Sequence, residues 1–523
     1  MEPEPEPVLE EAEPPETEAE TEEGDPPEPE PAETEPEGEN DGDYEEYVRY
    51  GVSVAGIRHA VSLFGDDLAG ATTSDLCQLH IKPHTVPPGW TDEPTHIRYD
   101  KKGNDVSANG WYRHQYICGA TGEKQSAAPD GTRSMCQVLK DDPSTSHFVG
   151  RPTIFLSHAW LYLILTVLDA LELFVAALPE GAPEPFFWFD CFSLDQHAQS
   201  GQGPEWWRGT FLRAIGEIGH TVMVLSPWDN PIPLTRAWCL WELYCTHKMK
   251  ARFSVCVGSD QREGLERAVL ENFDILFEVF SKISVEHAAA SNEDDERWIK
   301  QVVRKEIGYR GLDAIAFAEM REWVFGVARE LALKTDSLRD KQMIAILFKK
   351  FGVKEEAKRL YLEVIEGYTA TLGPGHTETL RTKGNLAELL REEGTKESKQ
   401  EAKRLFLEVI EGQTATNGAN HPDTLRTKGN LASLLKNEGT KESKEEAKRL
   451  FLEVIEGETA HYGPAHTETL ITKGNLAIMW IDDGEIDRAK AEFVQVVEGF
   501  ERDLGPEHSW TEWAKGQLAR CEQ

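Results

Sequence analysis

Residues Thr221–Thr246 read TVMVLSPWDNPIPLTRAWCLWELYCT, and this stretch decides the fold. It opens with an apolar, β-branched run, Thr221–Leu225, which predicts a buried strand. Ser226-Pro227 ends the strand, because proline cannot donate to a central sheet ladder, and the prolines that follow predict a loop. From Arg236 to about Met249, apolar residues recur every three to four residues, which predicts a helix. The stretch is therefore a strand, a loop and a helix.

The same alternation extends over residues 151–260. Further strands are predicted at Thr153–Ser157, Phe186–Asp190 and Arg252–Val257, and further helices at Trp160–Leu178 and Trp206–Gly219. Continuously apolar strands that alternate with helices predict a parallel sheet covered on both faces. Ligands of such sheets bind beyond the carboxyl ends of the strands. Those ends carry polar and aromatic residues, which suit a ligand of nucleotide size.

Glu242 lies among aromatic residues in the predicted helix after the third strand, because Trp238 and Trp241 are close to it in sequence. Burying a carboxylate costs free energy unless the group is paired or used, and burial raises its pKa. Two interpretations stay open from the residues alone. Glu242 is either a half-exposed helix residue or a functional acid.

Three motifs in this region resemble the TIR (Toll/interleukin-1 receptor-like) domain. The closest is Trp238-Cys239-Leu240-Trp241-Glu242-Leu243, which resembles the family pattern W-C-x-x-E-L. Thr153–His158, TIFLSH, resembles the opening strand, and Phe186–Asp190 resembles the second strand with its terminal Asp. The resemblance covers about residues 150–260 and implies a flavodoxin-like parallel sheet. The sequence departs from the family in the mobile loop, Cys191–Trp206, and after Cys256.

The resemblance implies two alternative functions. Some TIR-like domains cleave NAD at the nicotinamide–ribose bond, with NAD as substrate, not cofactor, and with one essential Glu on the helix that follows the third strand. Here that residue is Glu242, and Trp160, Asp190, Phe192 and Trp238 are the corresponding substrate-binding candidates. One carboxylate beside the ribose suits an oxocarbenium-like transition state. Other TIR-like domains are non-catalytic adaptors that self-associate. Self-association is expected here too, and clustering is expected to order the 191–206 loop over the ligand.

Composition limits the remaining possibilities. Residues 1–50 hold 22 acidic residues and one arginine, so they carry −21 of the net charge of −38. The Glu/Pro-rich segment 1–43 is predicted to be disordered, because it cannot bury enough apolar surface. An acidic chain without a basic stripe is not expected to bind nucleic acid. No P-loop or GxGxxG motif occurs, which argues against another nucleotide-binding fold.

The cellular compartment is predicted from the cysteines and the N-terminus. The eight cysteines are scattered and form no CxxC pair, a pattern of reducing compartments. No signal peptide is expected, and the apolar run Trp160–Leu178 carries Asp169 and Glu172, which disfavour membrane insertion. A cytoplasmic location without a membrane span is therefore expected.

Residues 44–150 are predicted to be an extension that packs on the α/β core. Tyr47–Leu63 suggests a short helix, whereas Ile81–Pro94 and Gly119–Gly131 are rich in loop-forming residues. Five residues could form a zinc site on paper: Cys77, His80, His84, His114 and Cys118. Their spacing does not match a usual zinc module, so no metal site is predicted.

The last third of the chain repeats itself. The block Glu356–Gly367 recurs nearly intact from Glu401 and Glu446. Residues 261–350, which precede the repeats, are predicted to be helical. The steps of 45, 45 and 42 residues predict a solenoid of helix pairs over residues 351–523. These repeats resemble the tetratricopeptide repeats of kinesin light chains, including the G-x-x-H-P-x-T connection at Gly418–Thr424. About three full repeats are expected, with partial ones at the ends.

One polar residue recurs in the block Thr-Lys-Gly-Asn-Leu-Ala. In the related repeats the Asn of this block faces a concave groove and binds peptide backbone, which assigns that role to Asn385, Asn430 and Asn475. Lys383, Lys428 and Lys473 are expected near them. The alternative is that the asparagines bridge neighbouring helices. The sequence thus predicts a protein or peptide partner for the repeats.

Overall fold

The computed structural model describes residues 48–65, 68, 70–99, 105–106, 111–197, 204–290 and 292–522. The predicted disordered tail, residues 1–43, lies outside the described residues. The central part of the predicted mobile loop, residues 198–203, also lies outside them.

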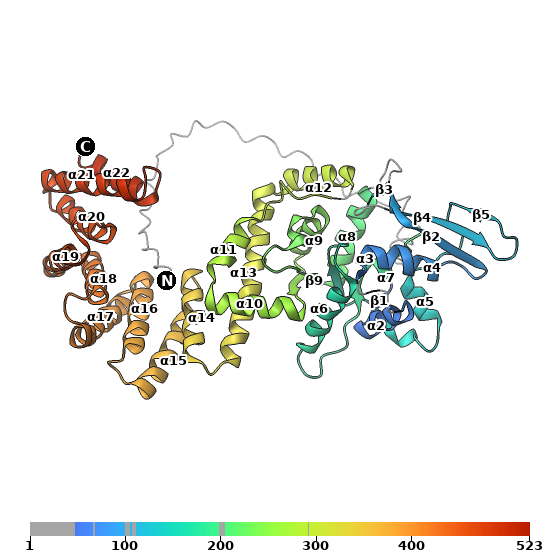
Figure 1. Ribbon diagram of the computed structural model, residues 1–523, viewed down its shortest axis with the longest axis horizontal. Coiled ribbons are helices and arrows are strands. Elements are labelled where there is room, and N and C mark those ends of the chain that lie inside the picture. Colours follow the sequence, from blue (N-terminus) through green and yellow to red (C-terminus); the bar gives the residue numbers. More distant parts are fainter. Residues whose placement is uncertain are drawn as a thin grey trace, which may run out of the picture. The chain divides into compact units, whose positions relative to one another are not determined.

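A six-stranded mixed sheet forms the centre of the α/β region (Figure 1). Its strand order is β10-β9-β7-β8-β1-β6. The four predicted strands are present and mutually parallel, and their bounds are β7 Ile154–Ser157, β8 Phe187–Trp188, β9 His220–Val224 and β10 Arg252–Cys256. The inner strands β7 and β8 are fully buried because both faces of the sheet are covered there, whereas the edge strand β10 begins with the exposed Arg252.

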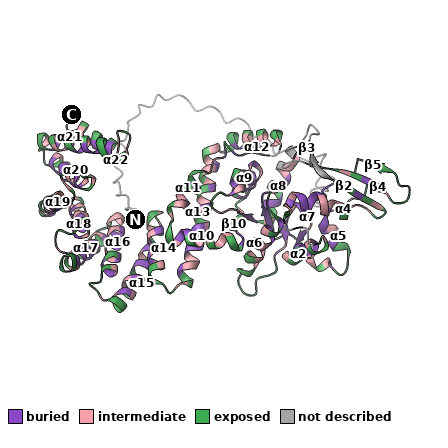
Figure 2. Ribbon diagram, viewed as in Figure 1, coloured by how far each residue is buried: buried purple, intermediate pink, exposed green. Residues whose placement is uncertain are grey.

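Helices cover both faces of this sheet, as the sequence predicts. Helix α6, Ile164–Ala176, contacts β9 and β10. Helices α8, Pro204–Ile218, and α9, Ala237–Lys248, contact each other and β9. Figure 2 shows α9 as largely buried. Trp241 and Cys245 of α9 are at most 1% exposed, so this helix is a core element.

The expectation of an all-parallel sheet is wrong at one edge. Strand β1, Gly51–Val52, pairs antiparallel with β8, and β6, Val149–Gly150, pairs antiparallel with β1. Both strands come from the segment before residue 151, which therefore extends the sheet. A strand of two residues gives no alternation that a sequence can reveal.

The segment before residue 151 shares the core of the α/β region. Its helices are α2 Val54–Leu63, α3 Thr73–Asp75, the π-helical turn η2 Leu76–Ile81, α4 Lys82–His84, α5 Met135–Asp141 and the 3₁₀ turn η3 Ser146–Phe148. Ile57, Leu76 and Cys136 are fully buried in one cluster with Leu171 and Phe187.

A second sheet was not predicted. It has the order β3-β2-β4-β5 and is antiparallel, with bounds β2 Trp90–Tyr99, β3 Asp105–Val106, β4 Trp111–Cys118 and β5 Lys124–Gln125. This part of the chain resembles a loop in sequence because it contains Pro94. In the structure, the register of β2 against β4 shifts between Pro94 and Arg98. An irregularity there accommodates the residue that cannot donate.

Helices follow the sheet without interruption by strands. They are α10 Ser259–Glu271, α11 Asp274–Ser281, α12 Glu293–Glu306 and α13 Tyr309–Lys334. Residues 261–350 are largely helical, as the sequence predicts, but the chain breaks at Asn272, whose backbone leaves the helical region. None of the described helices combines the length and apolar character needed to cross a membrane. All eight cysteines lie in the described part and are free.

The repeats form four helix pairs and a final helix (Figure 1). The pairs are α14 Leu338–Lys350 with α15 Lys354–Leu372, α16 Thr377–Glu393 with α17 Lys396–Asn417, α18 Pro422–Glu438 with α19 Lys441–Tyr462, and α20 Thr467–Asp482 with α21 Ile486–Asp503, followed by α22 Ser509–Arg520. We call the first helix of each pair A and the second B. The array thus begins at Leu338, before the expected boundary at 351. The sequence did not reveal α14 as a repeat helix, because it lacks the Thr-Lys-Gly-Asn-Leu-Ala block that marks later A helices.

The turn between pairs explains the G-x-x-H-x-x-T motif. In the Gly418–Thr424 turn, Gly418 has φ of 98°, a value that glycine adopts without strain. His421 caps α18, because its Nδ1 accepts from the backbone N–H of Asp423 at 3.2 Å. Thr424 Oγ1 donates to the carbonyl of Gly418 at 2.9 Å. The equivalent bonds recur in the turns at Gly373, Gly463 and Gly505.

A glycine of each B helix faces a leucine of an A helix. A Cβ built on Gly412 would lie 2.7 Å from a methyl carbon of Leu380, and one on Gly457 would lie 2.7 Å from both methyl carbons of Leu425. Gly367 and Gly499 face Leu338 and Leu470 in the same way. The absence of a side chain on the glycine therefore sets how closely the two helices approach.

Candidate functional site

The candidate site lies where β7 and β9 end side by side. Along the chain, β7 is followed by β8, which pairs with one side of β7. The next strand, β9, pairs with the other side of β7, so the direction in which strands are added to the sheet reverses at β7. Such a switch point is where open α/β sheets bind ligands. Ser157, the last residue of β7, donates from Oγ to Glu242 Oε2 of α9 at 2.5 Å. Glu242 is 9% exposed.

The environment of Glu242 favours its neutral form. Burial raises the pKa of Glu242 to about 8, the hydrogen bond from Ser157 opposes this shift, and the charge of Asp190 adds to it. The carboxyl is therefore largely protonated at pH 7. The half-exposed interpretation of Glu242 is wrong, because the side chain is buried.

Trp160 and Asp190 meet beside this acid. Trp160 Nε1 donates to Asp190 Oδ2 at 2.7 Å, and the backbone N–H of Cys191 donates to Oδ1 at 2.7 Å. Asp190 begins α7, Asp190–Ser193, just after β8. Both residues follow strand ends, as the sequence predicts, and the indole group is therefore fixed by the carboxylate.

Phe192 and Trp238 are not brought to this site. Phe192 is fully buried and its ring stacks on Phe189, with centroids 5.3 Å apart. Trp238 packs against Phe211 of α8 and Trp298 of α12, with centroids at 5.5 and 6.3 Å. The sequence spacing of Trp238 and Glu242 predicts a shared helix face, but their side chains contact different neighbours.

Three residues at the site were not among the site candidates named from the sequence. Ser157 is the partner of Glu242. Cys239, one turn before Glu242, donates from Sγ to the carbonyl of His158 at 3.4 Å. His158 is buried, and burial lowers its pKa. The sequence did contain a signal for Ser157 and His158, since they are the first polar residues after the apolar run Ile154–Leu156.

The five residues considered for zinc do not come together. His114 lies between Asp92 and Gln78, at 2.7 and 3.0 Å. Cys77 of η2 donates instead to Gln196 at 3.0 Å. Within the described residues, the one group suited to hold a metal is His158, Asp190 and Cys191.

The repeats present a second candidate site. Asn385, Asn430 and Asn475 occupy the same position of α16, α18 and α20, and each is half-buried. We call them the asparagine row. Asn430 Nδ2 donates to Glu388 Oε1 of α16 at 2.5 Å, so this residue bridges neighbouring A helices. Among the described residues, no hydrogen-bond partner faces the side chains of Asn385 and Asn475.

The three lysines near the row are held by their own pairs. Lys383, Lys428 and Lys473 lie 2.8, 2.5 and 3.0 Å from Glu408, Glu453 and Glu492 on the following B helix. Their side chains are at most 15% exposed. These ion pairs therefore join the two helices of a pair. Polar groups for a ligand are offered by the asparagine row and not by the lysines.

Comparisons with known proteins support the repeats. A family model described as tetratricopeptide repeat matches residues 342–378, that is, most of α14, all of α15 and the start of α16. No curated protein matches the chain. The family match does not extend to the α/β region.

Solved structures similar to part of the chain were also found. One contains the nearly identical TPR-like repeats of a kinesin light chain candidate from Podosopora anserina, at 26% identity and a TM-score of 0.31, covering 36% of this chain and 85% of that one. Another is BtubC (BKLC) from P. vanneervenii, at 16% identity and a TM-score of 0.30, covering 47% and 92%. The family match thus covers the first helix pair of the array, α14 with α15.

Proposed function

We propose that this chain is an interaction scaffold whose repeats bind a segment of a partner protein through the asparagine row. The carrying observation is the recurrence of one half-buried amide at the same position of three A helices. An amide offers both a donor and an acceptor, the two groups that an extended peptide backbone presents. Because the amide recurs in three successive helix pairs, it suits a ligand that also repeats along its length.

Replacing all three asparagines by alanine is expected to weaken peptide binding strongly. Each lost hydrogen bond contributes about 1 kcal/mol, so three losses predict roughly a 100-fold weaker affinity. The measurement is selection of binders from a displayed random-peptide library with the full chain, followed by titration of recovered peptides against parent and variant.

The matched control replaces Glu366, Glu411 and Glu456 by alanine. These residues are exposed and occupy one equivalent position of three B helices. The control should bind the recovered peptides as the parent does. Equal binding by the asparagine variant, or no peptide selected by the parent, would contradict the proposal.

A second function is proposed for the α/β region, namely TIR-like cleavage of NAD at the nicotinamide–ribose bond. The order β8-β7-β9-β10 supports a flavodoxin-like arrangement, and the position of Glu242 at the switch point favours a ligand site there. The nicotinamide ring carries a positive charge, which would stabilise the ionised form of Glu242. Glu242 is 9% exposed, so substrate reaches its carboxyl only after neighbouring side chains move. The alternative is a non-catalytic TIR-like adaptor.

NAD consumption by the full chain is expected to fall at least about 100-fold in Glu242→Gln, since one preorganised stabilising group is lost. Turnover is measured at low and at high protein concentration, because self-association of the TIR-like region is part of this proposal. The control is Glu458→Gln in α19, since Glu458 is also a buried acid, whose pKa burial raises to about 7. A parent protein that is inactive at every concentration would contradict NAD cleavage and leave the adaptor alternative. A Glu242→Gln variant that is fully active would contradict the role of Glu242 in cleavage.

A further inference from the structure

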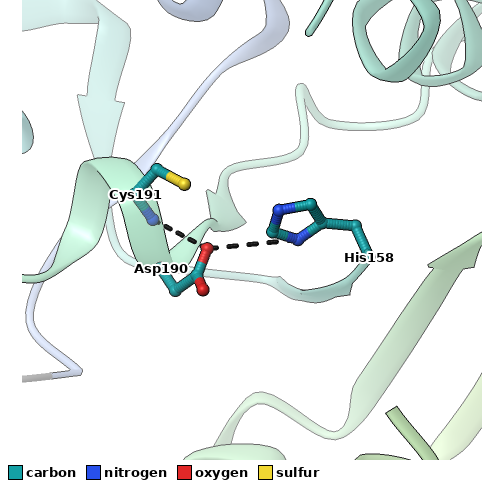
Figure 3. Close-up of side chains that lie close together, drawn as sticks. All are labelled: His158, Asp190 and Cys191. Carbon is teal, nitrogen blue, oxygen red and sulfur yellow. Dashed lines mark hydrogen bonds and ion pairs between the residues drawn. The ribbon is translucent and has the colours of Figure 1, made fainter. Parts of the chain in front are cut away.

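Three side chains of metal-ligand type meet at the ends of two neighbouring strands. His158 follows β7, and Asp190 and Cys191 begin α7 after β8 (Figure 3). One ligand atom from each residue lies within 4.8 Å of the other two. His158 Nδ1 is 4.0 Å from Asp190 Oδ1, too far for a hydrogen bond. The imidazole and the carboxylate therefore lie close together without a hydrogen bond between them.

The histidine is left incompletely satisfied. The side chain of His158 is 2% exposed, and no described residue forms a hydrogen bond with its Nε2. A buried polar atom without a partner is costly, and such atoms in native proteins usually have a ligand, an ion or a water as partner. Figure 3 shows this ring nitrogen on the side that faces the Cys191 sulfur.

We propose that His158, Asp190 and Cys191 bind one thiophilic divalent cation, for which Zn²⁺ is the best match. Zinc takes imidazole nitrogen, thiolate sulfur and carboxylate oxygen, and three protein ligands leave a fourth position for water. The thiolate and the carboxylate balance the charge of the ion. The Cys191 thiol loses its proton to solvent when the ion binds.

The geometry requires only a small contraction. Metal–ligand bonds of about 2.0–2.3 Å at tetrahedral angles place ligand atoms roughly 3.5 Å apart. The observed separations, up to 4.8 Å, therefore need side-chain shifts on the order of 1 Å. Asp190 is the ligand with access to solvent, because its side chain is 21% exposed, whereas Cys191 is fully buried. The ion would thus enter past Asp190.

The proposal concerns binding alone and does not depend on NAD cleavage. The full chain is titrated with Co²⁺, whose thiolate complexes absorb in the near ultraviolet and whose tetrahedral complexes absorb in the visible. One equivalent is expected to produce both bands, and Zn²⁺ should displace the cobalt. Cys191→Ser should abolish the near-ultraviolet band, and His158→Gln should weaken binding at least about 10-fold.

The matched control is Cys256→Ser, which replaces a buried free cysteine of β10 and should leave the bands unchanged. X-ray absorption of the cobalt-loaded parent gives a test that needs no variant, and it should find one sulfur and at least two nitrogen or oxygen ligands. Ligation without sulfur, a near-ultraviolet band that persists in Cys191→Ser, or absence of the bands from the parent would overturn the proposal.

Discussion

Replacing Glu242 by glutamine is expected to stabilise the protein, and the gain is expected to grow as the pH rises. The pKa of Glu242 is about 8 in the folded chain, against 4.5 for an ordinary glutamic acid. Between these values the folded state holds a proton that the unfolded state has released. Stability therefore falls as pH rises through this window, by at most about 1.4 kcal/mol per pH unit, and is constant below it.

Glutamine removes this dependence while keeping an oxygen that accepts from Ser157. The variant should be more stable than the parent by about 4 kcal/mol at pH 8 and by less than about 1 kcal/mol at pH 5. Urea unfolding at the two pH values measures the difference. Glu263→Gln is the control, since the Glu263 side chain is 77% exposed and should show no such change. A stability difference for Glu242→Gln that is equal at both pH values would show that the carboxyl is not held neutral.

The second large effect is expected from Gly457→Ala. The new methyl would lie 2.7 Å from both methyl carbons of Leu425, which is fully buried. Overpacking of this kind costs about 1–3 kcal/mol, and the better helix propensity of alanine offsets only about 1 kcal/mol. The urea midpoint of the helical signal should therefore fall.

Gly429→Ala is the matched control within the same helix pair. Gly429 is also helical, but an added Cβ would meet nothing within 4 Å. Helix propensity then acts alone and predicts a gain of about 1 kcal/mol. The two substitutions are chemically identical, so opposite signs isolate the contact with Leu425. Equal effects would mean that the helices of a pair separate at little cost.

The elements that sequence predicts best are those with a long period. The helices of the repeats and the apolar strands of the parallel sheet were found because burial imposes spacing over many residues. The two-residue strand Gly51–Val52 has no period to detect, and the charged strand Trp90–Tyr99 contains a proline. Both depend on partners that are distant in sequence, which propensity does not report.

The candidate site was predictable in position but not in detail. Trp160, Asp190 and Glu242 were named from the TIR resemblance, and the structure places Trp160 and Asp190 after strand ends, where the topology brings them together. Phe192 and Trp238 were placed there by likeness, yet their large apolar side chains are buried against other aromatic rings. His158 was missed as a possible ligand because its neighbours, Asp190 and Cys191, lie some 30 residues later in the chain.

The self-contained turn between repeats has an evolutionary consequence. Each turn is closed by its own glycine, histidine and threonine, and so its geometry does not depend on which pair precedes it. The residues Thr395–Lys399 and Thr440–Lys444 are also identical, TKESK, at the same place in successive pairs. Unequal recombination between two such points would add or remove one whole unit and leave every junction intact. The reach of the array along a bound partner can thus change in steps of one unit, without any new interface having to arise.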